Sequence, residues 1–373
     1  MPLYMKILLL LVNLLFYTSV IISQTVADCF IDDQRIIENN IILVGETHGY
    51  ASNYDVWCKL YDQVDRVSGI NFIIAEIDYA SAYIINRAIK QQDTLKLKKV
   101  LLSFNGSPWR SEEKLRFYKY LIDNGFKGEF VGVDIPAAGL RYTKIYIDSI
   151  ASKYNIDIRD LSHRLEEIYS GGNNIDSIIL LGDEYHFNND DRISWEIVIR
   201  NITFRNMAFN SKSKDWDKLR DKFIEMNMLT LNNLCDFKNK KSIGMWGSNH
   251  VYKEESESTK WFASRVKSSL DLEIYSILLL YTNSTVMAPL YWLGEKGSGF
   301  IYSEKFNDHR SVKKLYKQIK KHSDSSRCIS EDIVTQISSR LIIEGAKEGT
   351  TIGDYVSSIW VIDKSKPMNE LID

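Results

Sequence analysis

The sequence is poor in proline and cysteine and carries almost no net charge. It has five prolines and four cysteines in 373 residues, and 47 basic residues face 49 acidic ones, for a formal net charge of −2. Without a basic surplus there is no support for a nucleic-acid partner. The cysteines are scattered, and no C-x-x-C pair indicates a zinc or redox motif. An exported chain could form one disulfide, but the spacing does not say which pair: Cys29, Cys58, Cys235 and Cys328.

Several signature motifs are also missing. There is no P-loop and no G-x-G-x-x-G after the first expected strand, so nucleotide binding has no support. The absence of a G-x-S-x-G elbow disfavours a serine hydrolase. No repeat and no proline- or glycine-rich linker divides the chain, and apolar residues make up 45% of it. We therefore expect one domain over residues 25–373 with a substantial core.

The first 24 residues have the features of a secretory signal peptide. Lys6 precedes a long apolar stretch that Asn13 interrupts, and the small polar pair Ser23-Gln24 follows. This order predicts cleavage near Ser23 or Gln24, export to the periplasm or the extracellular space, and no stable membrane partner afterwards. The alternative is an uncleaved segment that anchors the protein in the membrane, because the stretch approaches the length of a short span.

Four short apolar runs each lead to an acidic residue or a histidine. Runs of this length bounded by glycine are typical of strands buried on both faces. They are Ile41–Val44 before Glu46 and His48, Phe72–Ala75 before Glu76, Phe130–Val133 before Asp134, and Ile243–Trp246 before Asn249 and His250. In open parallel sheets the ligand crevice lies at the carboxyl ends of the strands. We expect these polar side chains to converge on one crevice.

The segments between these runs predict an α/β fold with a mostly parallel central sheet flanked by helices. Helices over Asn53–Val67 and about Tyr79–Leu102 alternate with the strands, which indicates crossover connections and predicts that strands one and two are neighbours. Residues from about 140 to 240 have mainly helical patterns, so we expect a helical insertion or cap between strands three and four. The charged segment Lys253–Thr259 is expected to be an exposed loop over the crevice.

Glu46, His48, Glu76 and His250 form the predicted catalytic centre. A histidine in such a cleft can act as a general base near neutral pH or bind a metal. Carboxylates at neighbouring strand ends repel unless a cation lies between them, which suits acid–base work or a divalent cation. If a metal is present, these four side chains are its expected ligands. Otherwise one histidine activates water and the other polarises a carbonyl. His48 could instead be a turn or capping residue, and Glu46 and Glu76 could each cap a following helix.

Three further residues are candidates for substrate binding or for supporting the centre. Asp134 is a plausible hydrogen-bond partner for either histidine. Asn249 can donate and accept hydrogen bonds beside His250. Arg205, on the helix before strand four, is a candidate clamp for an oxyanion or a carboxylate. The alternative for Arg205 is an ordinary surface arginine.

In this order, the motifs resemble those of the erythromycin esterase family. The resemblance covers about residues 41–252. The erythromycin esterase family is part of a wider superfamily that includes Tiki proteases, TraB/GumN proteins and ChaN-like haem-binding proteins. It rests on Ile42-Leu43-Val44-Gly45-Glu46-Thr47-His48-Gly49, Ala75-Glu76, Gly132-Val133-Asp134, Arg205-Asn206-Met207 with Asn210, and Trp246-Gly247-Ser248-Asn249-His250-Val251.

The resemblance implies hydrolysis of an ester, lactone or amide in a small molecule by water that His48 activates. Glu46 and Glu76 would orient His48 or hold a cation, and His250 would complete the site. One residue separates Glu46 from His48, a spacing closer to the ChaN-like pattern. The alternative function is therefore a binding protein that holds haem or a metal without turnover. A third is a degenerate member whose cleft is blocked by Trp57, Trp109 or Trp246.

Overall fold

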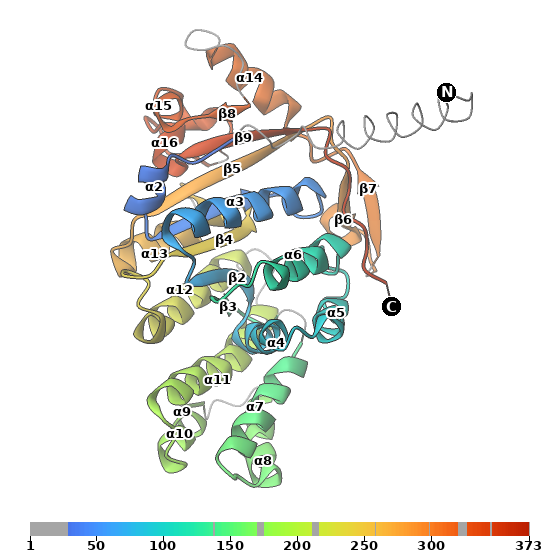
Figure 1. Ribbon diagram of the computed structural model, residues 1–373, viewed down its shortest axis with the longest axis vertical. Helices are drawn as coiled ribbons and strands as arrows, with labels where there is room; N and C mark the ends of the chain where they lie inside the picture. Colours follow the sequence, from blue (N-terminus) through green and yellow to red (C-terminus); the bar gives the residue numbers. More distant parts are fainter. Residues whose placement is uncertain are drawn as a thin grey trace, which may run out of the picture.

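The computed structural model of the chain describes residues 29–136, 139–169, 175–210, 216–257, 259–297, 299–319, 327–343 and 345–372. Its centre is a seven-stranded sheet in the order β3-β2-β4-β1-β5-β9-β8 (Figure 1). Every pairing is parallel except that of β8 with β9. The strands are β1 (Ile41–Glu46), β2 (Phe72–Asp78), β3 (Glu129–Asp134), β4 (Ser242–Gly247), β5 (Ile274–Thr282), β8 (Cys328–Ile329) and β9 (Ser358–Asp363). The expected α/β fold with a mostly parallel sheet is confirmed.

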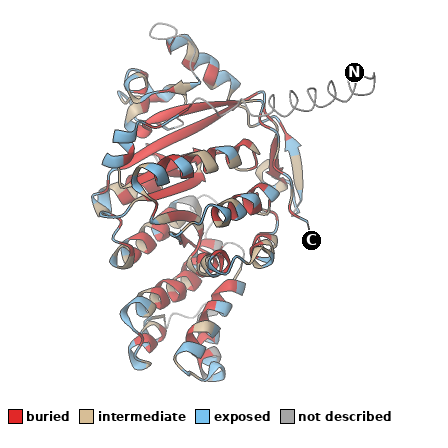
Figure 2. Cartoon of the chain, in the orientation of Figure 1, coloured by how far each residue is buried: buried red, intermediate tan, exposed pale blue. Residues whose placement is uncertain are grey.

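The central strands are buried on both faces, as their continuous apolar runs predict. In β1, Ile42 and Val44 face one hydrophobic cluster, while Ile41 and Leu43 face the other. Figure 2 shows the resulting buried interior of the sheet. Both faces therefore need a layer of helices, and only the strand ends remain open to a ligand.

Helices cover both faces of the sheet and also extend beyond one edge of it (Figure 1). The buried apolar residues of α3, α4, α5 and α6 belong to one of the two clusters, and those of α13 and α14 belong to the other. Helix α12 contributes to this second cluster and, through Phe223, to a third, smaller one. The longer helices are α3 (Ser52–Ser68), α4 (Tyr79–Lys90), α5 (Thr94–Leu102), α6 (Glu112–Asp123), α7 (Arg141–Lys153), α8 (Ile158–Tyr169), α11 (Asn189–Asn210), α12 (Trp216–Cys235), α13 (Phe262–Leu270) and α14 (His309–Ile319). The short ones are α2 (Asp33–Glu38), α9 (Ile175–Ile179), α10 (Leu181–Glu184), α15 (Glu331–Val334) and α16 (Ile352–Tyr355), with 3₁₀ turns η1 (Ser248–Val251), η2 (Leu290–Leu293) and η3 (Ser339–Leu341).

The chain between β3 and β4 is helical, and this confirms the predicted insertion at about residues 140–240. Its helices α7 to α11 form the lower part of Figure 1. The last of the insertion, α12, returns to the sheet, where the side chain of Asn227 donates to the carbonyl of Val133 at 2.8 Å. The insertion thus places α12 beside the end of β3.

The order of the strands corrects one prediction. Strands β1 and β2 are not neighbours, because β4 lies between them and pairs with both. The crossover through α3 skips one position in the sheet, and the chain fills that gap only after the helical insertion. As a result, the end of β4 lies directly between Glu46 and Glu76.

The single helix expected over about Tyr79–Leu102 is two helices. It breaks at Gln92, which has a left-handed φ of 54°. Asp93 then caps α5 by accepting a hydrogen bond from the backbone N–H of Lys96 at 2.9 Å. An aspartate before threonine is a common helix start, and it outweighs the continuing helical pattern of apolar residues.

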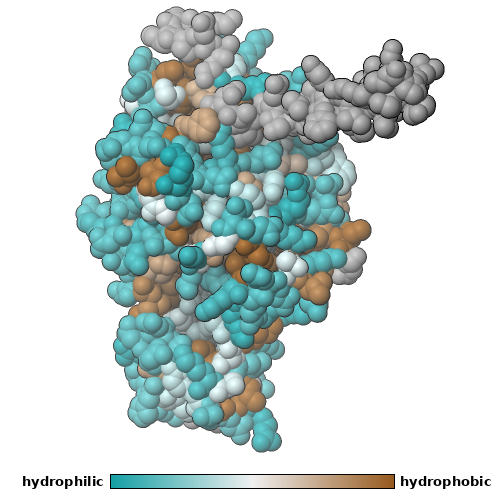
Figure 3. Space-filling model, in the orientation of Figure 1, coloured by the Kyte–Doolittle hydropathy of each residue, from teal (hydrophilic) through white to brown (hydrophobic). Residues whose placement is uncertain are grey.

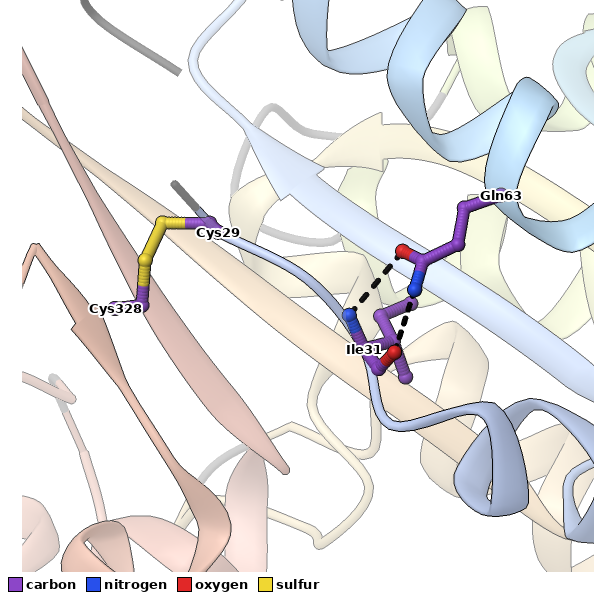
Figure 4. The surroundings of a disulfide bond; sticks show 4 residues. All are labelled: Cys29, Ile31, Gln63 and Cys328. Carbon is purple, nitrogen blue, oxygen red and sulfur yellow. Dashed lines mark hydrogen bonds between the residues drawn. A yellow bond between two sulfur atoms is a disulfide. The ribbon is translucent and has the colours of Figure 1, made fainter. Parts of the chain in front are cut away.

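A disulfide joins the first described residue to the edge strand β8 of the sheet. Cys29 and Cys328 are bonded, at a sequence separation of 299 (Figure 4). Nearby, the backbone N–H of Ile31 donates to the side chain of Gln63 at 3.2 Å, and Gln63 donates to the carbonyl of Ile31. Residues 1–28, which include the predicted signal peptide, lie outside the described residues. None of the described helices has the length and apolarity to span a membrane.

Loss of this disulfide is expected to lower stability. Cross-linking such distant positions restricts the unfolded chain, so Cys29→Ser with Cys328→Ser should reduce the free energy of unfolding by about 2–5 kcal/mol. Denaturant titration measures this, and Cys58→Ser is the control, since it leaves the disulfide intact. Detection of free thiols at Cys29 and Cys328 in the oxidised protein would contradict the pairing.

The hairpin of β6 (Val286–Pro289) and β7 (Phe300–Ser303) and the C-terminal segment stand beside the sheet. This segment contacts two loops near the strand ends: the backbone N–H of Met368 donates to the carbonyl of Gly49, and that of Leu371 donates to the carbonyl of Arg110. On the face shown in Figure 3 the described surface is mainly hydrophilic, with hydrophobic side chains in separate groups.

Candidate active site

A pocket of about 880 Å³ lies at the carboxyl ends of the parallel strands. Its size is typical of small-molecule sites, which span roughly 300–1,000 Å³. Six of the seven predicted site residues line it: Glu46, His48, Glu76, Asp134, Asn249 and His250. The expectation that the strand ends share one crevice is therefore met for these six.

His48 lies in the turn that follows β1. The Asn53 side chain donates to the carbonyl of Thr47 at 3.0 Å and accepts a hydrogen bond from Tyr281 at 2.6 Å, which fixes the turn from two sides. Gly49 ends the turn with φ of 97°, a left-handed conformation that favours glycine. The imidazole is thus held at the edge of the pocket.

The His48 ring lies between two carboxylates. Its Nδ1 is 2.8 Å from Glu46 and its Nε2 is 3.3 Å from Glu76. The other oxygen of Glu46 accepts a hydrogen bond from the Trp57 indole at 2.7 Å. Burial lowers the pKa of His48, but the bonds from Glu46 and Glu76 outweigh it and raise that pKa to about 10. His48 is therefore an imidazolium at neutral pH, with both N–H groups donated to carboxylates.

This ion cluster predicts a loss of stability in alkaline solution. A pKa of about 10, against 6.5 for an ordinary histidine, makes the contribution of His48 complete below about pH 6.5 and lost as pH rises through 10. The contribution is at most roughly 5 kcal/mol. Unfolding free energies between pH 6.5 and 10 should fall more steeply for the wild type than for His48→Gln. Parallel curves would contradict the arrangement.

Gly247 lets the two histidines face the same space. A Cβ on Gly247 would lie 3.7 Å from Nε2 of His48 and 3.9 Å from Nε2 of His250. The backbone N–H of Gly247 also donates to Glu76 at 3.1 Å. Glu76 approaches both rings, since its other oxygen is 3.8 Å from Nε2 of His250. A side chain at position 247 would enter the space where a reacting group must lie.

Arg220 lies at the centre of the site, and the sequence argument missed it. Its guanidinium contacts Glu76 at 2.6 Å and Asp134 through Nε and Nη2, at distances from 2.5 to 3.1 Å. Burial raises the pKa of Glu76, but Arg220 and then His48 hold it well below its ordinary value. Asp134 was predicted to bond to one of the histidines, but in the structure it binds Arg220. No motif marks Arg220; the one local signal is its i, i+4 spacing from Trp216 on α12.

His250 is buried and paired with Asp221, a second residue of α12 that the sequence argument missed. Nδ1 of His250 is 2.9 Å from the Asp221 carboxylate, which is completely buried. On the other side, Nη1 of Arg220 is 3.2 Å from Nε2 of His250. Because a guanidinium can only donate, this nitrogen must carry a lone pair, which assigns the proton to Nδ1. Burial lowers the pKa of His250, but Asp221 outweighs it and the pKa is raised.

Arg205 does not line the pocket, contrary to its predicted role as a clamp. Its Nε donates to the carbonyl of Pro136 at 3.0 Å, so it holds the chain after β3. The arginine that lines the pocket is Arg220 of α12 and not Arg205 of α11.

Lys114 is a buried cation directly behind the site. It is 7% exposed, and its Nζ lies 3.6 Å from the ring centre of Trp57 and 4.0 Å from that of Trp109. No carboxylate within the described residues forms an ion pair with it. Burial lowers the pKa of Lys114 to about 8, although Glu46 and Glu76 oppose this. The two indole faces stabilise an ammonium that is otherwise unfavourable here.

Replacing Lys114 with methionine should therefore not destabilise the fold. At pH 7 we expect the free energy of unfolding to rise by about 1–3 kcal/mol, because an apolar chain of similar size removes a buried charge. Denaturant titration measures the change. Lys119→Met is the control, because Lys119 is exposed on the same helix and its replacement should change stability by less than about 0.5 kcal/mol. A clear loss of stability in Lys114→Met would show that Lys114 is a net stabilising residue.

The four predicted metal ligands do not fit a metal as they are arranged. Each is already bonded to another side chain of the cluster, and the guanidinium of Arg220 supplies positive charge beside Glu76. Among the described residues, no three His, Cys, Asp or Glu side chains form a group that could hold an ion. We therefore derive no step that needs a metal.

Aromatic side chains from four segments surround the pocket. They are Phe104 and Trp109, Trp216, Trp261, Tyr291 and Trp292. The three tryptophans suspected of blocking the cleft leave it open: Trp57 and Trp246 are buried in the two cores, and Trp109 forms part of the wall. The segment Lys253–Thr259 is not a loop over this pocket, because Lys253 and Glu257 bond to the backbone of Tyr355 and Gly345.

Comparison with known proteins supports the fold. No protein-family model and no curated protein matches the chain. A variant of the erythromycin esterase EreC in its open conformation matches with a TM-score of 0.63 at 15% identity, over 91% of this chain and 94% of that one. The fold is similar to that of an erythromycin esterase. A succinoglycan biosynthesis protein matches with a TM-score of 0.61 at 13% identity, over 90% of this chain and 91% of that one. A protein from Bacillus cereus matches with a TM-score of 0.60 at 14% identity, over 91% of this chain and 92% of that one. At these low identities, the TM-scores show a shared α/β fold.

Proposed function

We propose that the protein is an exported hydrolase that cleaves an ester, lactone or amide in a small molecule. The observation that carries this proposal is the pair of histidines at one pocket, one buried against Asp221 and the other held between Glu46 and Glu76. The architecture shared with an erythromycin esterase supports it. Export is supported by the N-terminal segment and by the Cys29–Cys328 disulfide, since such bonds persist in oxidising compartments.

The geometry changes the roles that the sequence predicted for the histidines. His48 was the expected general base, but both of its nitrogens are bound to carboxylates and it holds its proton tightly. With Nε2 facing the Arg220 donor and Nδ1 2.9 Å from the Asp221 carboxylate, His250 can hold its proton on Nδ1 and its lone pair on Nε2, as an aspartate–histidine base does. We therefore assign the general base to His250 and the cationic, proton-rich role to His48.

Hydrolysis then follows from these assignments. Nε2 of His250 takes a proton from a water molecule, whose oxygen adds to the carbonyl carbon. The oxyanion that forms is stabilised by the Arg220 guanidinium and the His48 imidazolium at the floor of the pocket. The carbon–oxygen or carbon–nitrogen bond breaks, and His250 returns its proton to the leaving alcohol or amine. Glu46, Glu76 and Asp134 hold the two cations in place.

The test is hydrolysis of a panel of esters, lactones and amides by the purified protein. We expect release of a carboxylic acid from at least one class, with activity lost in His250→Gln. The alternative function, haem binding without turnover, predicts a Soret band after haem addition and no hydrolysis across the panel. A Soret band without hydrolysis would overturn the proposal.

A further inference from the structure

The pocket has charged residues at the strand ends, which form its floor, and aromatic residues around them, which form its walls. Four of the eight tryptophans of the chain line the pocket: Trp109, Trp216, Trp261 and Trp292. Tyr291 stands beside them and is 59% exposed. An aromatic side chain in contact with water is costly unless a ligand covers it, and here such rings surround one opening.

Polar side chains lie among these rings. Thr47, Ser248 and Asn249 face the pocket, and no described group forms a hydrogen bond with their side chains. The same three residues and Trp261 also line a second pocket of about 550 Å³, in which Tyr252, Ser256 and Asp308 add further polar groups. The free hydroxyl and amide groups thus lie at the junction of an aromatic pocket and a polar one.

The charge of the floor limits what can bind. Glu46, Glu76, Asp78 and Asp134 line the pocket with only His48 and Arg220 as cations. The excess of negative charge disfavours substrates that carry phosphate, carboxylate or sulfate groups away from the reacting centre, whose single oxyanion meets Arg220 and His48. Nucleobases also stack on aromatic rings, but nucleotides bring phosphate into this field.

We propose that the substrate is an ester of a neutral carbohydrate, and this rests on the proposed hydrolase function. The C–H face of a sugar ring packs on the negative face of an indole, while its hydroxyls bond to groups between the rings. Tryptophan walls with free hydroxyl and amide groups match both features. In the reaction, water adds to the acyl carbon, the acyl carbon–oxygen bond breaks, and the sugar hydroxyl takes the proton as the carboxylic acid leaves.

The experiment tests carbohydrate binding and ester hydrolysis separately. Binding of unmodified xylo-oligosaccharides and of oligogalacturonate is measured by calorimetry. Hydrolysis is measured on acetylated xylo-oligosaccharides, a choline ester and p-nitrophenyl acetate. We expect the neutral sugar to bind at least about tenfold more tightly than the acidic one, and Trp261→Ala and Trp292→Ala each to weaken binding and raise KM for the sugar ester about tenfold. Tyr302→Ala is the control, since Tyr302 is exposed outside both pockets.

Each outcome has a definite meaning. Hydrolysis of p-nitrophenyl acetate without sugar binding, or a choline ester that is cleaved faster than the sugar ester, overturns the carbohydrate proposal and leaves the hydrolase standing. Sugar binding that depends on Trp261 and Trp292, with no ester cleaved, supports the carbohydrate site and overturns the hydrolase. Equal binding of the acidic oligosaccharide contradicts the charge argument and with it the proposal.

Discussion

Replacing His250 with glutamine is expected to lower kcat for ester hydrolysis by about 10²- to 10⁴-fold. Nε2 of His250 is the one ring nitrogen in the pocket that carries a lone pair, because Nε2 and Nδ1 of His48 are both bound to carboxylates. Glutamine keeps a polar side chain beside Asp221 but cannot take a proton from water. Steady-state kinetics measure the change, and thermal denaturation establishes that the variant is folded.

Two further variants make this result specific. Asp221→Asn should give a comparable loss, because an amide facing Nδ1 favours the tautomer with its proton on Nε2, where it meets Arg220. His163→Gln is the control, since His163 is exposed on α8. Full activity in a folded His250→Gln protein would remove His250 from the mechanism and return the base to another group.

Replacing Arg220 with methionine is expected to cost both stability and turnover. Its guanidinium joins Glu76, Asp134 and His250, so its removal leaves two buried carboxylates without their cation. Breaking a buried pair of this kind lowers the free energy of unfolding by about 3–5 kcal/mol. The folded fraction should also lose turnover, because the oxyanion loses its main cation.

The comparison with Arg205 tests whether this effect belongs to the site. Arg205→Met removes an arginine of α11 that bonds to a backbone carbonyl outside the pocket, so kcat should stay close to the wild type. Arg220→Lys should recover part of the stability but little activity, because an ammonium cannot make the forked contact with Asp134. Denaturant titration and kinetics at matched folded fractions measure both. A stable and active Arg220→Met protein would contradict the central position of Arg220.

Local sequence patterns predicted the sheet and the residues at its strand ends, but not the residues that α12 adds to the site. The runs that end at Glu46, Glu76, Asp134 and His250 predicted a common crevice because buried parallel strands present their ends at one edge. The position of β4 between β1 and β2 was not predictable in this way, since it depends on a pairing across about 160 to 200 residues of intervening chain. Arg220 and Asp221 were not predicted for a related reason. They lie on the last helix of the insertion, and their role appears only when α12 docks against the sheet.

The same reasoning explains why the protonation of His48 could not be predicted from the sequence. Its position after a strand is visible in the sequence, but its protonation depends on how close Glu76 comes, which the distance along the chain does not give. Only the 3.3 Å approach of Glu76, in addition to the local bond to Glu46, makes the ring a stable cation.

A structure of the protein with a phosphonate ester, a stable mimic of the tetrahedral intermediate, tests this active site most directly. We expect the phosphonyl oxygens to contact Arg220 and His48. The phosphorus atom should lie next to Nε2 of His250 and above Gly247. A phosphonate bound elsewhere, or one that His250 does not approach, would show that these residues do not form a hydrolytic centre.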